Sequence, residues 1–187
     1  SYFKIQTRKD TQMLENMFGS KVFSFPKPVD LVKLFIESST NNDDIILDFF
    51  AGSATTAHAV MKLNSEDGKH RKFIMVQLPE SLEDNLKTAS SNREKATLKN
   101  AIKFCSNNGL SKVLTEISKE RIRRAGEQIK QEIIEKKNKA GLLDDNIIDP
   151  ETFDNGFKVF KLNSTNINPW DGTIKLDETT IFSQTEV

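Results

Sequence analysis

The chain has 187 residues, enough to bury the core of one domain of ordinary size. Its 27 Lys and Arg residues balance 27 Asp and Glu residues, so no overall basic field points to nucleic acid, and such a contact would need a local patch. The single cysteine, Cys105, excludes a disulfide framework and a multi-cysteine zinc site, and we expect no metal. We find no signal-peptide pattern and no apolar run long enough to cross a membrane, which favours a soluble, cytoplasmic protein.

Three regions follow one another along the chain: a lead-in segment (1–20), a predicted α/β domain (21–165) and a polar tail (166–187). In the lead-in, apolar residues at helical spacing before Gly19 predict a short helix. Two prolines then hold the stretch VFSFPKP (22–28) in an extended conformation.

An amphipathic helix is predicted over 31–36, ahead of two apolar strands. DIILDFF (44–50) and KFIMVQL (72–78) are apolar runs of the kind expected for strands buried on both faces of a parallel sheet. The segment 55–63 suits a helix packed back on the first strand, and 62–71 reads as a solvated connection. Strand, turn, helix and strand make a βαβ unit, which predicts an α/β sheet with a right-handed crossover.

Helices are also predicted beyond the second strand. Periodicity over 81–108 is weakly helical, and a long helix is expected over about 111–140, capped by Gly141. Its apolar stripe consists of Leu110, Val113, Leu114, Ile117, Ile122, Ala125, Ile129 and Ile133. Such a helix would be on the order of 45 Å long, so we expect either a break near Gly126 or fraying beyond Glu135. GFKVFKL (156–162) alternates like a strand.

The stretch DFFAGSATTAHAV (48–60) joins the first strand to its helix through a tight turn. Such a turn points backbone N–H groups and the positive end of the helix dipole at a ligand, so an anion is the expected guest. The loop lacks the Gly-Lys-Ser/Thr ending of phosphate loops, and it has only Gly52 where the dinucleotide fingerprint needs three glycines. A ligand with a small carboxylate, a ribose and an aromatic base fits better, and S-adenosylmethionine is such a ligand.

The side chains around the turn suit that ligand. The Asp48 carboxylate can accept from its ammonium group, and the rings of Phe49 and Phe50 can flank its flat parts. Hydroxyl donors stand at the helix start: Ser53, Thr55 and Thr56. A plain strand-to-helix connection, with Ser53 or Thr55 as the N-cap, is an alternative of about equal weight.

This stretch resembles the cofactor-binding motif of DNA methyltransferases that modify the exocyclic amine of adenine, above all the modification (Mod) subunit of Type III restriction-modification systems. Further segments resemble that group in the same order: 22–37, 71–80, 117–129 and 156–170. The resemblance covers nearly the whole chain. It implies a Rossmann-like S-adenosylmethionine-dependent methyltransferase fold, present here as an incomplete, C-terminal portion.

The resemblance also implies roles for individual residues. The methionine side of the cofactor would meet Phe25, Lys27 and Pro28, its floor would be Asp48, Phe49, Phe50, Ala51, Gly52 and Ser53, and its ribose would meet Gln77 or Glu80. Ala54 stands where the family has glycine, and we expect its methyl group to be tolerated if its φ is negative. Gln77 stands where many relatives carry an acidic residue, so Gln77 and Glu80 compete for the ribose.

The catalytic loop of this family, of the Asp-Pro-Pro-Tyr type, is missing from the sequence. NPWD (168–171) is the nearest match, and it lacks the second proline, so we assign no catalytic residue. The implied partners are DNA, bound through the intact enzyme, a second Mod subunit in a homodimer, and a restriction subunit. The competing interpretation is a non-catalytic assembly or dimerisation module.

Other residues have competing interpretations. His58 is either a general base or, as we prefer, a packing residue. A basic stretch either contacts DNA phosphates or, as we prefer, forms a solvated face balanced by glutamates; it consists of Lys119, Arg121, Arg123, Arg124 and Lys130. Cys105 is expected to pack on an apolar face, and Trp170 and Phe182 are possible interface anchors.

Overall fold

The computed structural model describes residues 7–140 and 148–162. The chain divides into two compact units, Ser1–Gly156 and Phe157–Val187, and each is treated by itself. The first unit contains helices α1 (Thr7–Phe18), α2 (Val29–Ser39), α3 (Thr55–Asp67), α4 (Leu82–Thr88), α5 (Asn92–Asn107) and α6 (Leu114–Ala140), with strands β1 (Ile45–Asp48) and β2 (Lys72–Met75). Gly141, NPWD, Trp170 and Phe182 lie outside the described residues.

The predicted βαβ unit is present. Strands β1 and β2 pair in parallel, with Leu47 opposite Ile74, and α3 connects them. Both strands are shorter than predicted, because the chain turns after Asp48. The backbone contacts continue a little further, since the Val76 N–H donates to the Asp48 carbonyl (2.8 Å) and the Ala51 N–H donates to the Val76 carbonyl (3.1 Å). These bonds hold the loop after β1 against the end of β2.

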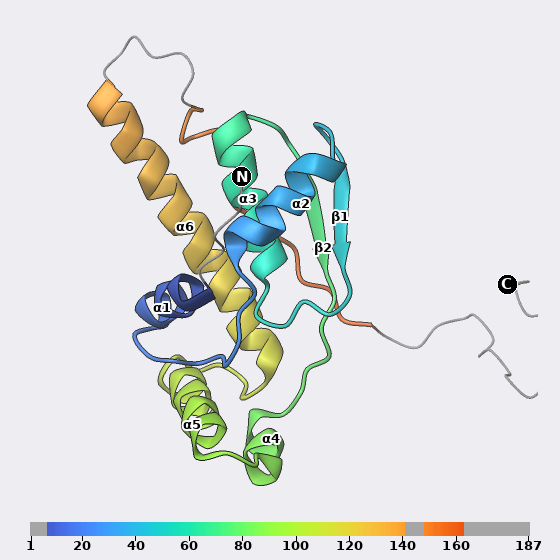
Figure 1. Cartoon of the computed structure of the whole chain (residues 1–187), viewed down its shortest axis with the longest axis vertical. Helices are drawn as coiled ribbons and strands as arrows, with labels where there is room; N and C mark the ends of the chain where they lie inside the picture. Colours follow the sequence, from blue (N-terminus) through green and yellow to red (C-terminus); the bar gives the residue numbers. More distant parts are fainter. Residues whose placement is uncertain (1–6, 141–147, 163–187) are drawn as a thin grey trace, which may run out of the picture. The chain divides into compact units, whose positions relative to one another are not determined.

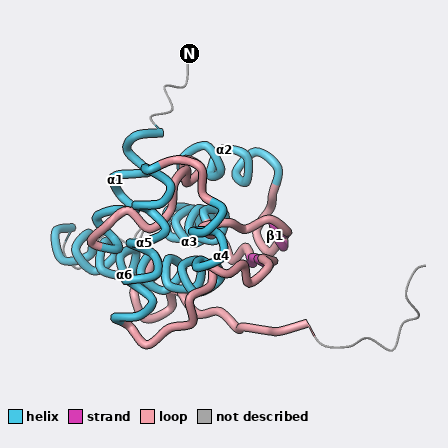
Figure 2. Tube along the Cα trace, turned by 90° about the horizontal axis from the view of Figure 1, so that it is seen from below, coloured by secondary structure: helices cyan, strands magenta, loops and turns pink. Residues whose placement is uncertain are grey.

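The described residues cover the sheet on one face only. Figures 1 and 2 show α2 and α3 on one side of the two strands, where Ile46 and Phe73 pack against a buried cluster from these helices. On the opposite face Ile45, Leu47 and Ile74 are 61%, 57% and 50% exposed. The prediction of strands buried on both faces is therefore wrong for the described residues, because none of them covers this second face.

Helix α3 runs four residues beyond its predicted end, into the segment expected to be a solvated connection. It stops at Gly68, whose φ of +69° lets its N–H donate to the Asn64 carbonyl at 2.9 Å. Arg71, just before β2, is buried and donates to the Asp67 carboxylate at 2.9 Å and to the Thr40 hydroxyl at 2.8 Å. An ion pair between the buried Arg71 and the solvent-accessible Asp67 thus joins the end of α3 to the start of β2.

A second cluster forms where α1, α5 and α6 meet. It consists of Leu14, Phe18, Val22, Leu82, Ala101, Phe104, Cys105 and Ile117. Phe18 and Phe104 meet edge to face with centroids 5.0 Å apart, and α1 ends at Gly19 as predicted, with φ +72°. Cys105 is fully buried, as expected, and burial raises the pKa of its thiol, with a smaller contribution from Glu116.

The helical prediction for 81–108 is confirmed by α4 and α5. Their N-caps are the serines Ser81 and Ser91, whose hydroxyls accept from Asp84 N–H (3.2 Å) and Glu94 N–H (3.1 Å). No strand forms over 156–162, contrary to the prediction. Alternation sets which face a strand would present, but a strand also needs a neighbour to bond, and the described residues supply none there.

Helix α6 runs through Gly126 without the predicted break. A side chain at Gly126 would place its Cβ 2.8 Å from the Asn155 Cβ and 3.5 Å from the Met61 sulfur. The absence of a side chain at Gly126 therefore allows Asn155 and Met61 of α3 to approach α6 closely. The predicted apolar stripe is confirmed for Ile117, Ile122, Ala125, Ile129 and Ile133, which are all buried. Its first members are only partly buried, and Leu110 and Val113 precede α6, which begins at Leu114 rather than at about 111.

Candidate functional site

The loop between β1 and α3 contains two residues in left-handed backbone conformation. Gly52 has φ +51° and Ala54 has φ +59° and ψ 42°. The negative φ on which we made tolerance of the Ala54 methyl group conditional is not found, and Ala54 is the single non-glycine residue with positive φ among those described. This conformation costs an alanine about 1 kcal/mol or more, which explains physically why glycine suits the position. The Ala54 methyl group is fully buried.

Asp48 connects the end of the strand to the start of the helix. One carboxylate oxygen accepts from the Phe50 N–H at 3.1 Å, and the other accepts from the Thr56 hydroxyl at 2.6 Å. The alternative prediction of Ser53 or Thr55 as the helix N-cap is wrong, because Ala54 occupies that position without a side-chain cap. Asp48 thus shapes the turn.

The two ribose candidates lie together beside the loop. The Gln77 side-chain oxygen accepts from the Gly52 N–H at 2.8 Å, and its NH₂ donates to Glu80 at 3.3 Å. Glu80 also accepts from the Asn85 side chain at 3.3 Å. Gln77, rather than Glu80, contacts the loop directly, and it connects the loop to the Glu80 carboxylate.

Aromatic side chains around the loop face solvent. Phe49 and Phe50 are 62% and 83% exposed, with ring centroids 5.2 Å apart. Phe25 and Lys27 are also exposed, whereas Pro28 is buried at the start of α2. A side chain at Gly52 would meet Phe23, the residue through which the 22–28 stretch reaches the loop, at 3.6 Å.

Two residues of α6 contact the loop, and sequence reasoning missed their role. The Ser118 hydroxyl donates to the Gly52 carbonyl. Arg121 donates from one guanidinium nitrogen to the Ser53 carbonyl (3.2 Å), the Ser53 hydroxyl (2.7 Å) and the Thr55 hydroxyl (2.7 Å). Arg121 is fully buried. Its position four residues after Ile117 and four before Ala125, within the apolar stripe, was the signal available in the sequence.

The residues of the basic stretch of α6 do not form a single solvent-exposed face. Arg124 donates to the Met17 carbonyl at 2.8 Å and lies over the rings of Phe18 and Phe104, so it anchors α1. Lys119 pairs with Glu116 at 2.5 Å. The preferred interpretation of a solvated, glutamate-balanced face is therefore wrong for Arg121, whereas Arg124 is balanced by Glu120 at 2.8 Å and in addition contacts α1.

His58 lies on α3 near Arg121 and is buried. Burial lowers the pKa of its imidazole to about 3, helped by the charges of Arg121 and Lys62. The ring is neutral at physiological pH, and its Nδ1 has no hydrogen-bond partner within the part of the chain that the structure describes. This environment suits the packing role rather than that of a general base open to substrate.

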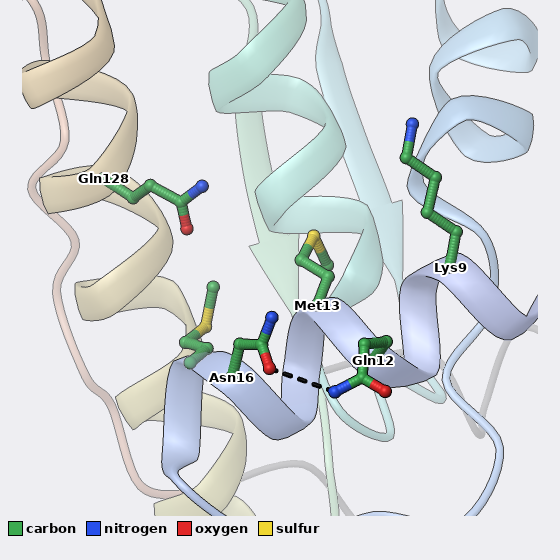
Figure 3. A pocket seen from close by; sticks show the side chains of 6 residues that line it. Lys9, Gln12, Met13, Asn16 and Gln128 are labelled. Atoms are coloured by element: carbon green, nitrogen blue, oxygen red, sulfur yellow. Dashed lines mark hydrogen bonds between the residues drawn. The ribbon is translucent and has the colours of Figure 1, made fainter.

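An open pocket of about 410 Å³ lies elsewhere, between α1 and α6 (Figure 3). Its lining consists of Lys9, Gln12, Met13, Asn16, Met17 and Gln128. It includes none of the predicted site residues. Within the described ranges, no cluster of three or more potential ligand side chains could hold a metal, and no helix is long and apolar enough to span a membrane.

The structure thus has a βαβ unit with a left-handed loop at the carboxyl end of its first strand, and carboxylates and exposed aromatic rings lie beside this loop. In open α/β sheets this is where ligands usually bind. A family model described as DNA methylase matches residues 2–131, more than half of the chain. The chain belongs to this DNA methylase family, and the predicted α/β class agrees with it.

Individual relatives agree. The chain is 50% identical to the Type III restriction-modification enzyme StyLTI Mod subunit of Salmonella typhimurium over 70 residues, 37% of this chain and 11% of the relative. It is 46% identical to the EcoPI Mod subunit of Escherichia phage P1 over 40% of this chain and 12% of that protein. It is also 46% identical to the Type II methyltransferase M.KpnI of Klebsiella pneumoniae, over 38% of this chain and 17% of that protein. The resemblance to Type III Mod subunits is confirmed, although the matched stretches are a small part of each relative.

Proposed function

We propose that this chain is the S-adenosylmethionine-binding part of a DNA methyltransferase that transfers a methyl group to the exocyclic amine of adenine. The supporting observation is the loop 48–56, where a left-handed turn at the carboxyl end of β1 leads into α3 beside Gln77 and Glu80. Membership of the DNA methylase family and the similarity to Mod subunits add support. The proposal includes a Rossmann-like fold for the region 21–165, followed by a tail.

The residues present fit the cofactor. Gly52 lacks a side chain where the ligand must approach the backbone, and the exposed ring of Phe50 offers a face to the adenine. Glu80 is exposed and in no ion pair among the described residues, so its carboxylate can accept from ribose hydroxyls, with Gln77 beside it. Phe25 and Lys27 would reach the methionine side.

Bound S-adenosylmethionine supplies a methyl group attached to a positively charged sulfur. The residues of this chain would hold and orient it, with Asp48 keeping the turn in shape through Phe50 and Thr56. The loop that receives the target adenine in the family is missing from this sequence. We therefore expect the chain alone to bind cofactor without methylating DNA, and robust methyl transfer by it would contradict this.

The intact enzyme would act on DNA in the cytoplasm, as a homodimer of Mod subunits joined by a restriction subunit. The relatives named as Mod subunits of Type III enzymes motivate this assignment. Calorimetric titration of the purified chain with S-adenosylmethionine, with NAD and ATP as controls, is the direct test. Saturable binding of S-adenosylmethionine alone supports the proposal, and binding of NAD or ATP instead would refute it.

Gly52→Val sharpens this test. A branched side chain at φ +51° distorts the turn and fills the approach to the backbone, so affinity for S-adenosylmethionine should fall at least about tenfold. Gly68→Val is the matched control, because Gly68 has φ +69° at the other end of α3 and no neighbour within 4 Å of an added Cβ. Gly68→Val should lower the free energy of unfolding about as much as Gly52→Val does, and it should leave the affinity for S-adenosylmethionine unchanged. Equal losses of affinity in both variants would point to general destabilisation.

A non-catalytic assembly module is the second candidate. The observation in its favour is the exposed apolar face of the sheet, around Leu47 and Ile74. Under this interpretation the chain has no cofactor affinity for Gly52→Val to remove. Sedimentation of the wild-type chain and of Gly52→Val separates the candidates, since assembly without any binding of S-adenosylmethionine supports only the module.

A further inference from the structure

We propose that Arg121 is a positioning residue for the cofactor loop: with Ser118, it holds residues 52–55 in the conformation that binds the anionic group of the ligand. The inference rests on the proposed function, since it concerns the same loop. Arg121 itself, buried beneath the loop, would not touch the ligand.

The contacts come from two residues one helical turn apart on α6. Ser118 bonds the Gly52 carbonyl, and Arg121 bonds the carbonyl and hydroxyl of Ser53 and the hydroxyl of Thr55. They bracket Ala54, whose left-handed backbone is unfavourable for alanine. A loop with such a residue keeps its shape only when its surroundings impose it, and α6 supplies that constraint from more than 60 positions away in sequence.

Among the described residues, the charge of Arg121 is only weakly compensated, by Asp10. Two of its guanidinium nitrogens, Nε and Nη2, are buried and find no hydrogen-bond partner among the described residues, none of whose carboxylates forms an ion pair with Arg121. Burial lowers its pKa to about 10, against a smaller opposing effect of Asp10, whose carboxylate accepts from the Val29 N–H, so Arg121 is still charged at neutral pH. A buried, unpaired cation costs stability, and stability alone does not account for this residue.

The position of this charge favours an anionic ligand. Arg121 lies against Ser53 and Thr55, the residues at the N-terminus of α3, where the helix dipole is also positive. The charge of Arg121 and the dipole of α3 would therefore both attract a carboxylate at the loop. A ligand that presents one there would offset a charge that the described residues compensate only weakly.

The test compares substitutions at two arginines of the same helix. Arg121→Met removes the charge and the three bonds to the loop, while Arg124→Met removes a cation that holds α1 and does not contact the loop. We expect Arg121→Met to weaken S-adenosylmethionine binding at least about tenfold. Its melting temperature should fall no further than that of Arg124→Met, because losing the desolvated charge offsets the lost bonds. Arg121→Lys, which keeps the charge, should recover part of the affinity.

Hydrogen exchange of the loop measures positioning without any ligand. Arg121→Met should speed amide exchange in residues 50–56, whereas Arg124→Met should leave that peptide at the wild-type rate. If Arg121→Met does not fold, Ser118→Ala replaces it, with the same loop exchange expected because the Gly52 carbonyl loses its donor.

The outcomes separate the two proposals. If the wild-type chain binds S-adenosylmethionine and Arg121→Met binds equally well, the positioning role is wrong and the proposed function stands. If the wild-type chain binds none, the cofactor proposal fails for this chain, and loop exchange alone decides: faster exchange in Arg121→Met supports positioning, and unchanged exchange overturns it.

Discussion

At the residue scale, His58 and Arg121 show how burial changes the meaning of a polar side chain. In the sequence, His58 follows a ligand loop and Arg121 belongs to a basic run, so each suggests contact with substrate or DNA. In the structure both are buried between α3 and α6, and the charge of Arg121 helps to keep the His58 imidazole neutral. Neither side chain is therefore open to substrate or DNA in the described structure.

The neutral state of His58 makes stability depend on pH. Its folded pKa of about 3 lies below the ordinary value of 6.5, so between these values the unfolded chain binds more protons than the folded one. The stabilisation is complete above about pH 6.5 and is lost as pH falls toward 3. Between pH 6.5 and 5 the loss should be about 2 kcal/mol.

Thermal unfolding at pH 7.5 and pH 5 measures this effect. His58→Gln should flatten the pH dependence of the melting temperature, because glutamine does not titrate. His70→Gln is the control, since His70 is exposed, and it should behave like the wild-type chain. The same pH dependence in His58→Gln and the wild-type chain would contradict a buried neutral His58.

At the element scale, glycine has two different uses in this chain. Gly19 and Gly68 have positive φ and end helices α1 and α3, and the sequence predicted the first of these two helix ends. Gly126 is inside α6, and its lack of a side chain serves a close approach of Asn155. The sequence shows where each glycine lies, but it does not show whether that glycine ends a helix or allows a close packing contact. The residues that pack against the glycine in the structure decide this.

Gly126→Ala should therefore destabilise the chain although alanine is the better helix former. The propensity gain is about 1 kcal/mol, while a Cβ 2.8 Å from the Asn155 Cβ forces a shift costing about 1 to 3 kcal/mol. Urea unfolding should give a net loss of roughly 1 kcal/mol. Asn155→Gly removes the clashing atom, so Gly126→Ala in that background should be neutral or stabilising, and a loss of the same size there would argue against the clash.

At the scale of the whole first unit, the sheet is exposed where an α/β domain is normally covered. Ile45 and Leu47 of β1 and Ile74 of β2 form one apolar face, since Leu47 and Ile74 are partners in register. Parallel sheets are usually covered on both faces. The continuous apolar runs of the sequence match such a sheet, whereas the described residues cover a single face.

This face should bind an apolar dye. The fluorescence of anilinonaphthalene sulfonate should fall by roughly half in the double variant Leu47→Gln, Ile74→Gln, because these neighbours form the centre of the patch. The matched control is Val159→Gln, Leu162→Gln, which changes exposed apolar residues of the second unit. Stability should change by less than about 1 kcal/mol in either variant. An equal loss of dye fluorescence in the two double variants would show that the dye does not bind at the exposed face of the sheet.

Local chemistry determined much of this protein from its sequence. The loop after β1, the βαβ order, the ends of α1 and α5 and the apolar stripe of α6 follow from turn residues and periodicity, which act over a few neighbouring positions. Only the tertiary structure decided the left-handed Ala54, the bonds from Arg121 to Ser53, the approach of Asn155 to Gly126 and the open face of the sheet. Each of these depends on what packs against a residue from elsewhere in the chain, and neither the propensity of a residue nor its local pattern carries that information.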